Sequence, residues 1–190
     1  MFHLRISSST DWLNAVMGDF DTFLVDHAAC ERKASATGMA FVVRYPDRLD
    51  LVDAMIGFAR EELEHYHRVI QEIIRRGLTL GPDTKDVYIE GLLEFIRKPS
   101  DERFLDRLLV PAVAEARGTE RFGLIANALP PGELADFYSD LTESEARHHG
   151  LFLSFAHRYF PKTVVRDRLS LLLDHEAQIL QALPIRAALH

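Results

Sequence analysis

Two stretches, Glu62-Leu63-Glu64-His65 and Glu145-Ala146-Arg147-His148, share the pattern Glu-x-x-His and lie in segments with helical periodicity. A single glutamate precedes each stretch at nearly the same distance, Glu31 before the first and Glu115 before the second. Residues three apart lie on one face of a helix, so each pair presents a carboxylate beside an imidazole. Four carboxylates and two imidazoles from four helices are the ligand set of a two-metal site inside a helical bundle.

The neighbours of the first pair indicate that it faces a protein core. Glu62 and His65 continue an apolar stripe that contains Met55, Phe58 and Val69 at helical spacing. A competing pair with the same spacing, Glu64 and His67, shares its face with the polar residues Arg60, Gln71 and Arg75. We therefore reject the competing pair as a solvent-exposed face.

The other candidate ligands are tested in the same way. Glu145 and His148 lie on a stripe with Leu141, Phe152 and Phe155, while Glu31 lies on a weaker series with Leu24, His27, Ser35 and Val42. Glu115 and Glu120 both have apolar neighbours, so periodicity leaves both open. The repeat spacing favours Glu115, because the candidate ligands then recur after about 84 residues, as in two related helical hairpins.

Glycine and proline residues divide the chain into helical segments. We expect helices over 11–17, from 19 or 21 to 44, 47–76 with Asp47 as the cap, 84–97, from 100 or 101 to 128, 132–159 and 163–183. Pro111 predicts a break or kink in the fifth of these helices. No segment has the alternation of a strand. The predicted fold class is all-α, a single domain over residues 1–190 built as a four-helix bundle with extra short helices.

Composition excludes several classes of protein. The 190 residues carry a net charge of −7, which argues against a generally basic nucleic-acid binder. The single cysteine, Cys30, excludes an internal disulfide and a thiolate zinc cluster, and fits a reducing cytoplasm. We expect neither a signal peptide nor a membrane span. Two basic clusters can contact RNA phosphates or be solvated helix ends: Arg97, Lys98, Arg103 and Arg107, and Arg158, Lys162, Arg166 and Arg168.

The ligand types indicate the metal and the role of each residue. Two divalent cations neutralise four carboxylates, and oxygen and imidazole ligands suit iron or manganese, between which the sequence does not choose. We expect Glu31 and Glu115 to be terminal carboxylate ligands. Glu62 and Glu145 are expected to bridge the two metal ions, and His65 and His148 are expected to bind one ion each.

Several neighbouring residues have two interpretations each. Glu61 and Ser144 directly precede the bridging glutamates, and we expect each to reach the opposite histidine and orient it. For His27 we favour a hydrogen-bonded core histidine over a contact to the metal ligands. Arg117 and Arg147 can bind a phosphate near the site, but we favour ion pairs.

The residues around the ligands resemble those of one family. The stretches Asp26-His27-Ala28-Ala29-Cys30-Glu31-Arg32-Lys33-Ala34, Glu61-Glu62-Leu63-Glu64-His65, Glu115-Ala116-Arg117, Glu120-Arg121-Phe122 and Glu145-Ala146-Arg147-His148-His149 resemble the MiaE family of tRNA 2-methylthio-isopentenyl-adenosine hydroxylases. The resemblance implies a ferritin-like fold and a di-iron monooxygenase in which Glu31, Glu62, His65, Glu115, Glu145 and His148 bind the two iron ions.

The same resemblance implies the reaction and its partners. One atom of O2 is inserted into the isopentenyl side chain of an adenosine beside the anticodon of a tRNA, and a reductase with a ferredoxin-type carrier supplies two electrons. We expect a monomer or dimer. Three other hypotheses stay open on the ligand set alone: iron oxidation and storage of the ferritin type, a peroxide-handling di-metal protein, and a binding module without a metal.

Overall fold

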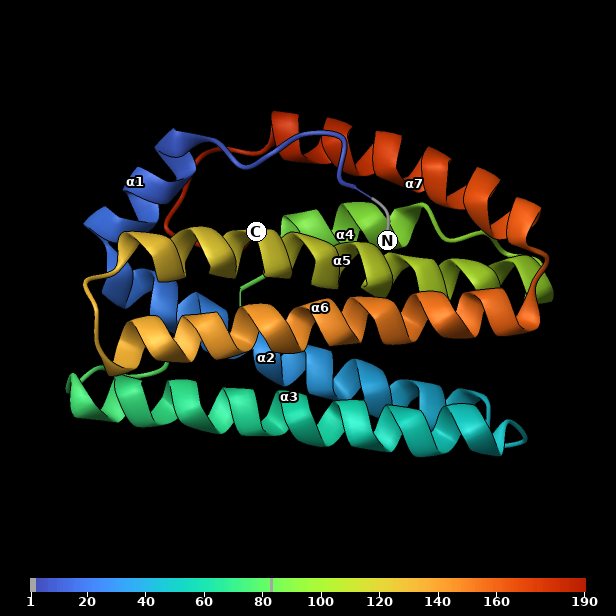
Figure 1. Ribbon diagram of the computed structural model, residues 1–190, viewed down its shortest axis with the longest axis horizontal. Helices are drawn as coiled ribbons and strands as arrows, with labels where there is room; N and C mark the ends of the chain where they lie inside the picture. Colours follow the sequence, from blue (N-terminus) through green and yellow to red (C-terminus); the bar gives the residue numbers. More distant parts are fainter. Residues whose placement is uncertain (1–2, 83) are drawn as a thin grey trace. The chain divides into compact units, whose positions relative to one another are not determined.

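A computed structural model describes residues 3–82 and 84–190, which form seven α-helices and no strand (Figure 1). The helices are α1 (Thr10–Gly18), α2 (Phe20–Arg44), α3 (Leu49–Arg75), α4 (Val87–Glu94), α5 (Ser100–Ala128), α6 (Glu133–Tyr159) and α7 (Lys162–Ala182). The four long helices predicted to carry the candidate ligands are α2, α3, α5 and α6, and their bounds lie within a few residues of the prediction. None of the helices in the described part of the chain is both long and apolar enough to cross a bilayer.

The described residues divide into two compact units. The α2–α3 unit contains residues 15–82, Thr84 and Arg186–Leu189, and the α5–α6 unit contains residues 3–14, Lys85–Ile185 and His190. Each unit has one long helical hairpin at its centre, and the single domain expected from the sequence stays a prediction.

In the α2–α3 unit the two helices approach closely. Asp19 caps α2 by accepting a hydrogen bond from the backbone N–H of Thr22 (3.2 Å). At Gly38, an added Cβ would lie 2.8 Å from Phe58 Cδ1 and 2.9 Å from the carbonyl oxygen of Met55. The absence of a side chain at Gly38 thus lets α2 pack directly against the backbone of α3.

The start of α3 differs from the prediction. Arg48 occupies the N-cap position and makes no side-chain capping hydrogen bond, so the expected cap at Asp47 is wrong. Burial of one face of α3, which includes Leu51 and Met55 from its first turns, stabilises this end of the helix in place of a cap.

In the α5–α6 unit, α5 and α6 pack side by side, together with α4 and α7 (Figure 1). The helix α5 continues through Pro111, so the predicted break does not occur, while the alternative of a kink stays a prediction. Its neighbours Val110 and Ala112 are buried, and this packing offsets the backbone hydrogen bond that proline cannot donate.

The helix α4 is shorter than the predicted 84–97. It begins after Asp86, whose carboxylate accepts from the N–H of Ile89 (3.0 Å). Beyond its end, the N–H of Arg97 donates to the Asp106 carboxylate (2.9 Å). A contact with a distant residue therefore replaces the helical hydrogen bond expected there.

Candidate metal centre

The α2–α3 unit places three of the predicted ligands together. Glu31 comes from α2, and Glu62 and His65 come from α3; all three are buried. His65 Nδ1 lies 3.6 Å from Glu31 Oε2 and 3.7 Å from Glu62 Oε2. One ligand atom from each residue lies within 4.8 Å of the other two. This donor set has the chemistry of a carboxylate-rich metal site.

The rest of α3 follows the face predicted for it. The stripe residues Met55, Phe58 and Val69 are buried beside Glu62 and His65. Glu64 and His67, the rejected pair, are exposed to solvent. Helical periodicity was therefore sufficient to separate the two Glu-x-x-His matches on this helix.

His27 contacts a predicted ligand rather than a neutral core group. Its Nε2 lies 2.6 Å from Glu31 Oε1, one helical turn away, and its ring is fully buried. The sequence favoured a hydrogen-bonded core histidine, and His27 is buried and hydrogen-bonded. Its partner, however, is the predicted ligand Glu31, as in the alternative interpretation. The spacing of four residues on a shared stripe was the signal for this contact.

The carboxylates of this unit favour a positive charge at its centre. Burial by itself lowers the pKa of His65, but its interactions with Glu31 and Glu62 outweigh burial and raise the pKa to about 10. A metal ion that bound His65 would have to displace this proton.

The α5–α6 unit assembles a second set of the same composition. Glu115 comes from α5, and Glu145 and His148 come from α6. One ligand atom from each lies within 4.8 Å of the other two, and His148 Nδ1 is 3.8 Å from Glu145 Oε2. A Cβ at Gly118 would lie 3.7 Å from Glu145 Cγ, so α5 presents its smallest residue to this carboxylate.

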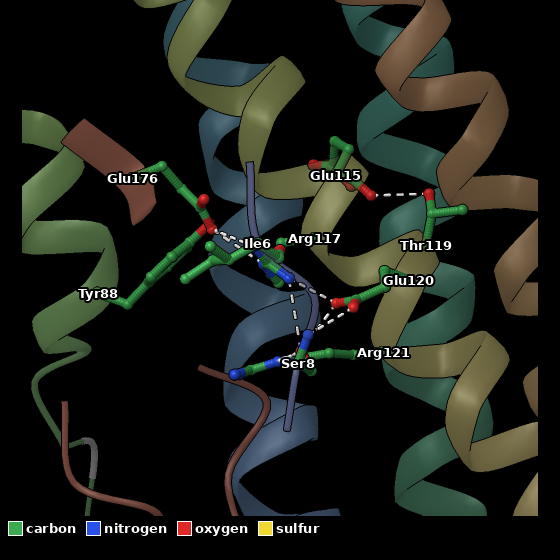
Figure 2. Close-up of polar contacts among 9 residues, drawn as sticks. All are labelled: Ile6, Ser8, Tyr88, Glu115, Arg117, Thr119, Glu120, Arg121 and Glu176. Atoms are coloured by element: carbon green, nitrogen blue, oxygen red, sulfur yellow. Dashed lines mark hydrogen bonds and ion pairs between the residues drawn. The ribbon is translucent and has the colours of Figure 1, made fainter. Parts of the chain in front are cut away.

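Glu120, the rival of Glu115, is engaged elsewhere (Figure 2). Its two carboxylate oxygens accept hydrogen bonds from the N–H of Ser8 (2.6 Å) and the hydroxyl of Ser8 (2.8 Å). Arg117 Nη1 also donates to Glu120 (2.6 Å). These contacts hold the N-terminal segment against α5 and support the choice of Glu115 made from the repeat spacing.

Arg117 is fully buried in a charged network that includes α7 (Figure 2). Its guanidinium lies 2.8 Å from Glu176 Oε1, to which the Tyr88 hydroxyl also donates (3.1 Å), and it donates to the carbonyl of Ile6 (3.0 Å). The ion pair favoured for Arg117 is confirmed. Sequence reasoning missed Glu176, although its place in the apolar stripe of Val165, Leu169 and Leu172 was a usable signal.

The residues predicted to orient the histidines have different environments. Glu61 is exposed on α3, whereas Ser144 is buried on α6 and accepts a hydrogen bond from Arg147 (3.1 Å). Their action on the opposite histidines stays a prediction. His149, beside His148, is buried with its Nδ1 3.1 Å from the carbonyl oxygen of Ala112 in α5.

Comparison with known proteins identifies the family. The family model described as tRNA-(MS[2]IO[6]A)-hydroxylase (MiaE) matches residues 2–190. The chain belongs to the MiaE family. A MiaE relative in Pseudomonas putida, named tRNA 2-(methylsulfanyl)-N(6)-isopentenyladenosine(37) hydroxylase, is 36% identical over 171 residues, which cover 90% of this chain and 83% of the relative.

Two further similarities bear on the MiaE assignment. A protein of the same name from Salmonella typhimurium is 34% identical over 106 residues, 56% of this chain and 39% of that protein. A solved structure described as Protein 43 with aldehyde deformylating oxygenase activity, from Synechococcus, is 35% identical, with a TM-score of 0.95 over 100% of this chain and 96% of that one. The predicted all-α, ferritin-like fold class is confirmed.

Proposed function

We propose that this protein is an O2-dependent hydroxylase that acts on the isopentenyl side chain of a 2-methylthio-isopentenyl-adenosine beside the anticodon of a tRNA. The match of the family model to residues 2–190 carries this proposal. The buried Glu and His residues in each unit support it, because insertion of an oxygen atom from O2 into a C–H bond requires a metal or cofactor. A tRNA substrate would place the protein in the cytoplasm, as the single cysteine also predicts.

We propose further that the two ligand sets act as one centre for two iron ions. The α2–α3 unit would contribute Glu31, Glu62 and His65, and the α5–α6 unit would contribute Glu115, Glu145 and His148. The donor chemistry fits, since four carboxylates neutralise two divalent ions and imidazoles bind metals in their neutral form, without adding charge. Glu62 and Glu145 would bridge the two ions. When bound, the iron would supply the activation of O2.

The protein's own residues would control access of water and substrate. The apolar stripes above and below each ligand set, such as Phe58 and Val69 on α3 and Phe152 on α6, keep the carboxylates in a dry environment. Hydroxylation converts one C–H bond to C–OH and releases the second oxygen atom as water. This requires two electrons, which we assign to a ferredoxin-type carrier and its reductase, and two protons, which come from solvent.

The proposal is tested with tRNA from cells that lack this protein. Purified iron-loaded enzyme, a reductant and O2 are added, and the nucleosides are analysed by mass spectrometry. We expect the modified adenosine to gain one oxygen atom and the enzyme to contain about two iron ions per chain. If the adenosine is unchanged under these conditions, the substrate assignment is wrong.

The similarity to the Synechococcus protein, which extends over the full length of this chain, favours aldehyde deformylation as a second candidate. The same iron-loaded enzyme is therefore assayed with an aldehyde. Loss of the formyl carbon from the aldehyde, with no change in the tRNA, would favour this second activity. Size-exclusion chromatography and a peroxide assay test iron storage and peroxide chemistry on the same sample.

A further inference from the structure

The two basic clusters seen in the sequence meet at one end of the α5–α6 unit. The start of α5 lies beside the end of α6, because the ring of Phe104 is 5.2 Å from that of Tyr159 and 5.8 Å from that of Phe160. The helix α7 begins directly after this end of α6 (Figure 1). Residues 95–107 and 157–168, distant in sequence, therefore form one surface.

Two of the arginines in these clusters are structural. Arg97 and Arg168 both bind the buried carboxylate of Asp106, at 2.9 Å and 2.7 Å. Arg168 also donates to the carbonyl of Phe95 (2.7 Å), with its guanidinium carbon 3.7 Å from the centre of the Phe95 ring. These contacts fix residues 95–97 to α5 and α7, and they remove two candidates from the set of phosphate-binding residues.

Five of the other cations of this surface face solvent, whereas Arg107 is half-buried. We define the basic end as the exposed residues Lys98, Arg103, Arg158, Lys162 and Arg166. Three exposed acids, Asp101, Glu102 and Asp167, lie in the same segments, and Asp167 is 2.7 Å from Arg166. Residues 95–107 and 157–168 nevertheless carry eight Lys or Arg against four Asp or Glu. Their net charge is +4 and the remainder of the chain carries −11, so positive charge is concentrated at one place.

We propose that the basic end is the surface that docks the phosphate backbone of the RNA substrate. This inference rests on the proposed function, which requires a strongly acidic chain to bind a polyanion. A local concentration of cations solves that problem for two reasons. Contacts between these cations and phosphates release counterions, which favours binding. Repulsion between the phosphates and the acidic remainder of the protein is screened by salt beyond about 10 Å. The first turn of α7 contains no acidic residue, so its helix dipole adds to the positive potential.

The position of the basic end also suits a base that enters the protein while its neighbours stay outside. Arg158 is ten residues from His148, about 15 Å along α6, and Arg103 is twelve residues from Glu115, about 18 Å along α5. These separations span only a few nucleotides of an RNA strand. The phosphates of a stem next to the reacting nucleotide can therefore lie at this surface.

The experiment compares the triple variant R103Q/R158Q/K162Q with the control R44Q/K85Q, which removes exposed cations outside the basic end. Binding of fluorescent tRNA is measured as a function of salt concentration. For the triple variant we expect affinity to fall about tenfold or more and the slope of log K against log salt to decrease by about 2 to 3, since each lost phosphate contact contributes about 0.7 to 0.9. For the control we expect little change.

A turnover assay separates RNA docking from docking of an acidic electron carrier. Enzyme reduced chemically is mixed with O2 and either whole tRNA or the free modified nucleoside. We expect the triple variant to lose turnover of tRNA and to retain wild-type turnover of the nucleoside, with unchanged iron content and thermal stability. If chemical reduction restores turnover of tRNA, the surface serves a carrier and the inference is wrong.

Two further outcomes overturn the inference. One is an unchanged affinity and salt slope for the triple variant; the other is an equal loss of affinity in the triple variant and the control, which indicates a general charge effect. Failure of the proposed function is distinct, because there the wild-type enzyme modifies neither tRNA nor nucleoside.

Discussion

The α2–α3 and α5–α6 hairpins carry the same ligand pattern but support it with different contacts. One turn before Glu31 lies His27, which contacts its carboxylate at 2.6 Å; one turn before Glu115 lies Pro111, which offers no polar side chain. The two hairpins therefore place equivalent carboxylates in unequal surroundings.

The means of holding each hairpin together also differ. In the α2–α3 unit, the hydroxyl of Ser35 on α2 donates to the carbonyl of Ala59 on α3 (2.7 Å), and the helices touch at Gly38. In the α5–α6 unit, the hydroxyl of Thr119 donates within its own helix to the carbonyl of Glu115 (2.8 Å; Figure 2). There the buried pair of Arg117 and Glu176 attaches α7 to the hairpin from outside.

The difference shows which features the ligand pattern controls. Spacing along a helix fixes which side chains face inward, so the Glu and His positions repeat in both hairpins. The groups that stabilise each hairpin depend on the segments that pack against it. These segments differ between the α2–α3 hairpin and the α5–α6 hairpin.

The largest effect should come from removal of one imidazole in either hairpin. We expect His65→Ala and His148→Ala each to lower hydroxylation by at least about 100-fold and to reduce bound iron, because each removes a proposed ligand. Activity and iron content by mass spectrometry are the measurements. His67→Ala, on the exposed face of α3, is the control and should resemble wild type. Full iron content and activity in either ligand variant would refute the assignment of that residue.

The largest effect on stability, rather than on activity, is expected where Arg117 supports the α5–α6 hairpin. Arg117→Met leaves the carboxylate of Glu176, which is 0% exposed, without its guanidinium, so the free energy of unfolding should fall by about 3–5 kcal/mol. The double variant R117M/E176M should recover most of this loss in urea denaturation.

The control for this prediction is the pair of Arg75, which is exposed, and Glu72, which is half-buried and also pairs with Arg76 in the other hairpin. Arg75→Met should cost no more than about 1 kcal/mol, since solvent screens the pair. Equal costs for Arg117→Met and Arg75→Met would show that the buried pair does not support the α5–α6 hairpin.

A smaller loss is expected where α2 and α3 touch. The Cβ of Gly38→Ala would lie 2.8 Å from Phe58 Cδ1, so the helices must move apart, at a cost of about 1–3 kcal/mol. Gly57→Ala, on the exposed side of α3, meets no atom within 4 Å and should stabilise the protein by about 1 kcal/mol. Thermal and urea unfolding measure both variants; an unchanged stability of the Gly38 variant would argue against close packing.

The smallest effect concerns the contact that only one hairpin possesses. His27→Phe retains a buried ring but removes the hydrogen bond to Glu31, and we expect iron affinity to fall about tenfold, equivalent to about 1.4 kcal/mol. Pro111→Ala, at the matching position of α5, should leave iron affinity unchanged. Equilibrium titration against a chelator measures both, and equal affinities for the two variants would mean that His27 does not position Glu31.

The sequence predicted the main helices and the buried faces because both depend on local periodicity. The polar face of Glu64 and His67 and the apolar face of Glu62 and His65 were distinguishable within a single helix. The sequence did not predict the length of α4, because the hydrogen bond from the N–H of Arg97 to Asp106 depends on another helix, α5.

The sequence by itself determined the all-α class, the inward direction of the candidate ligands and the family resemblance, because each resides in spacing or local residue identity. Only the tertiary structure decided the partners of buried charges: Glu176 meets Arg117, Glu31 meets His27, and Asp106 meets Arg97 and Arg168. It also merged two basic clusters into one surface. Helical periodicity determines whether a side chain points toward the core or toward solvent, whereas the residue that it contacts belongs to a segment distant in the chain.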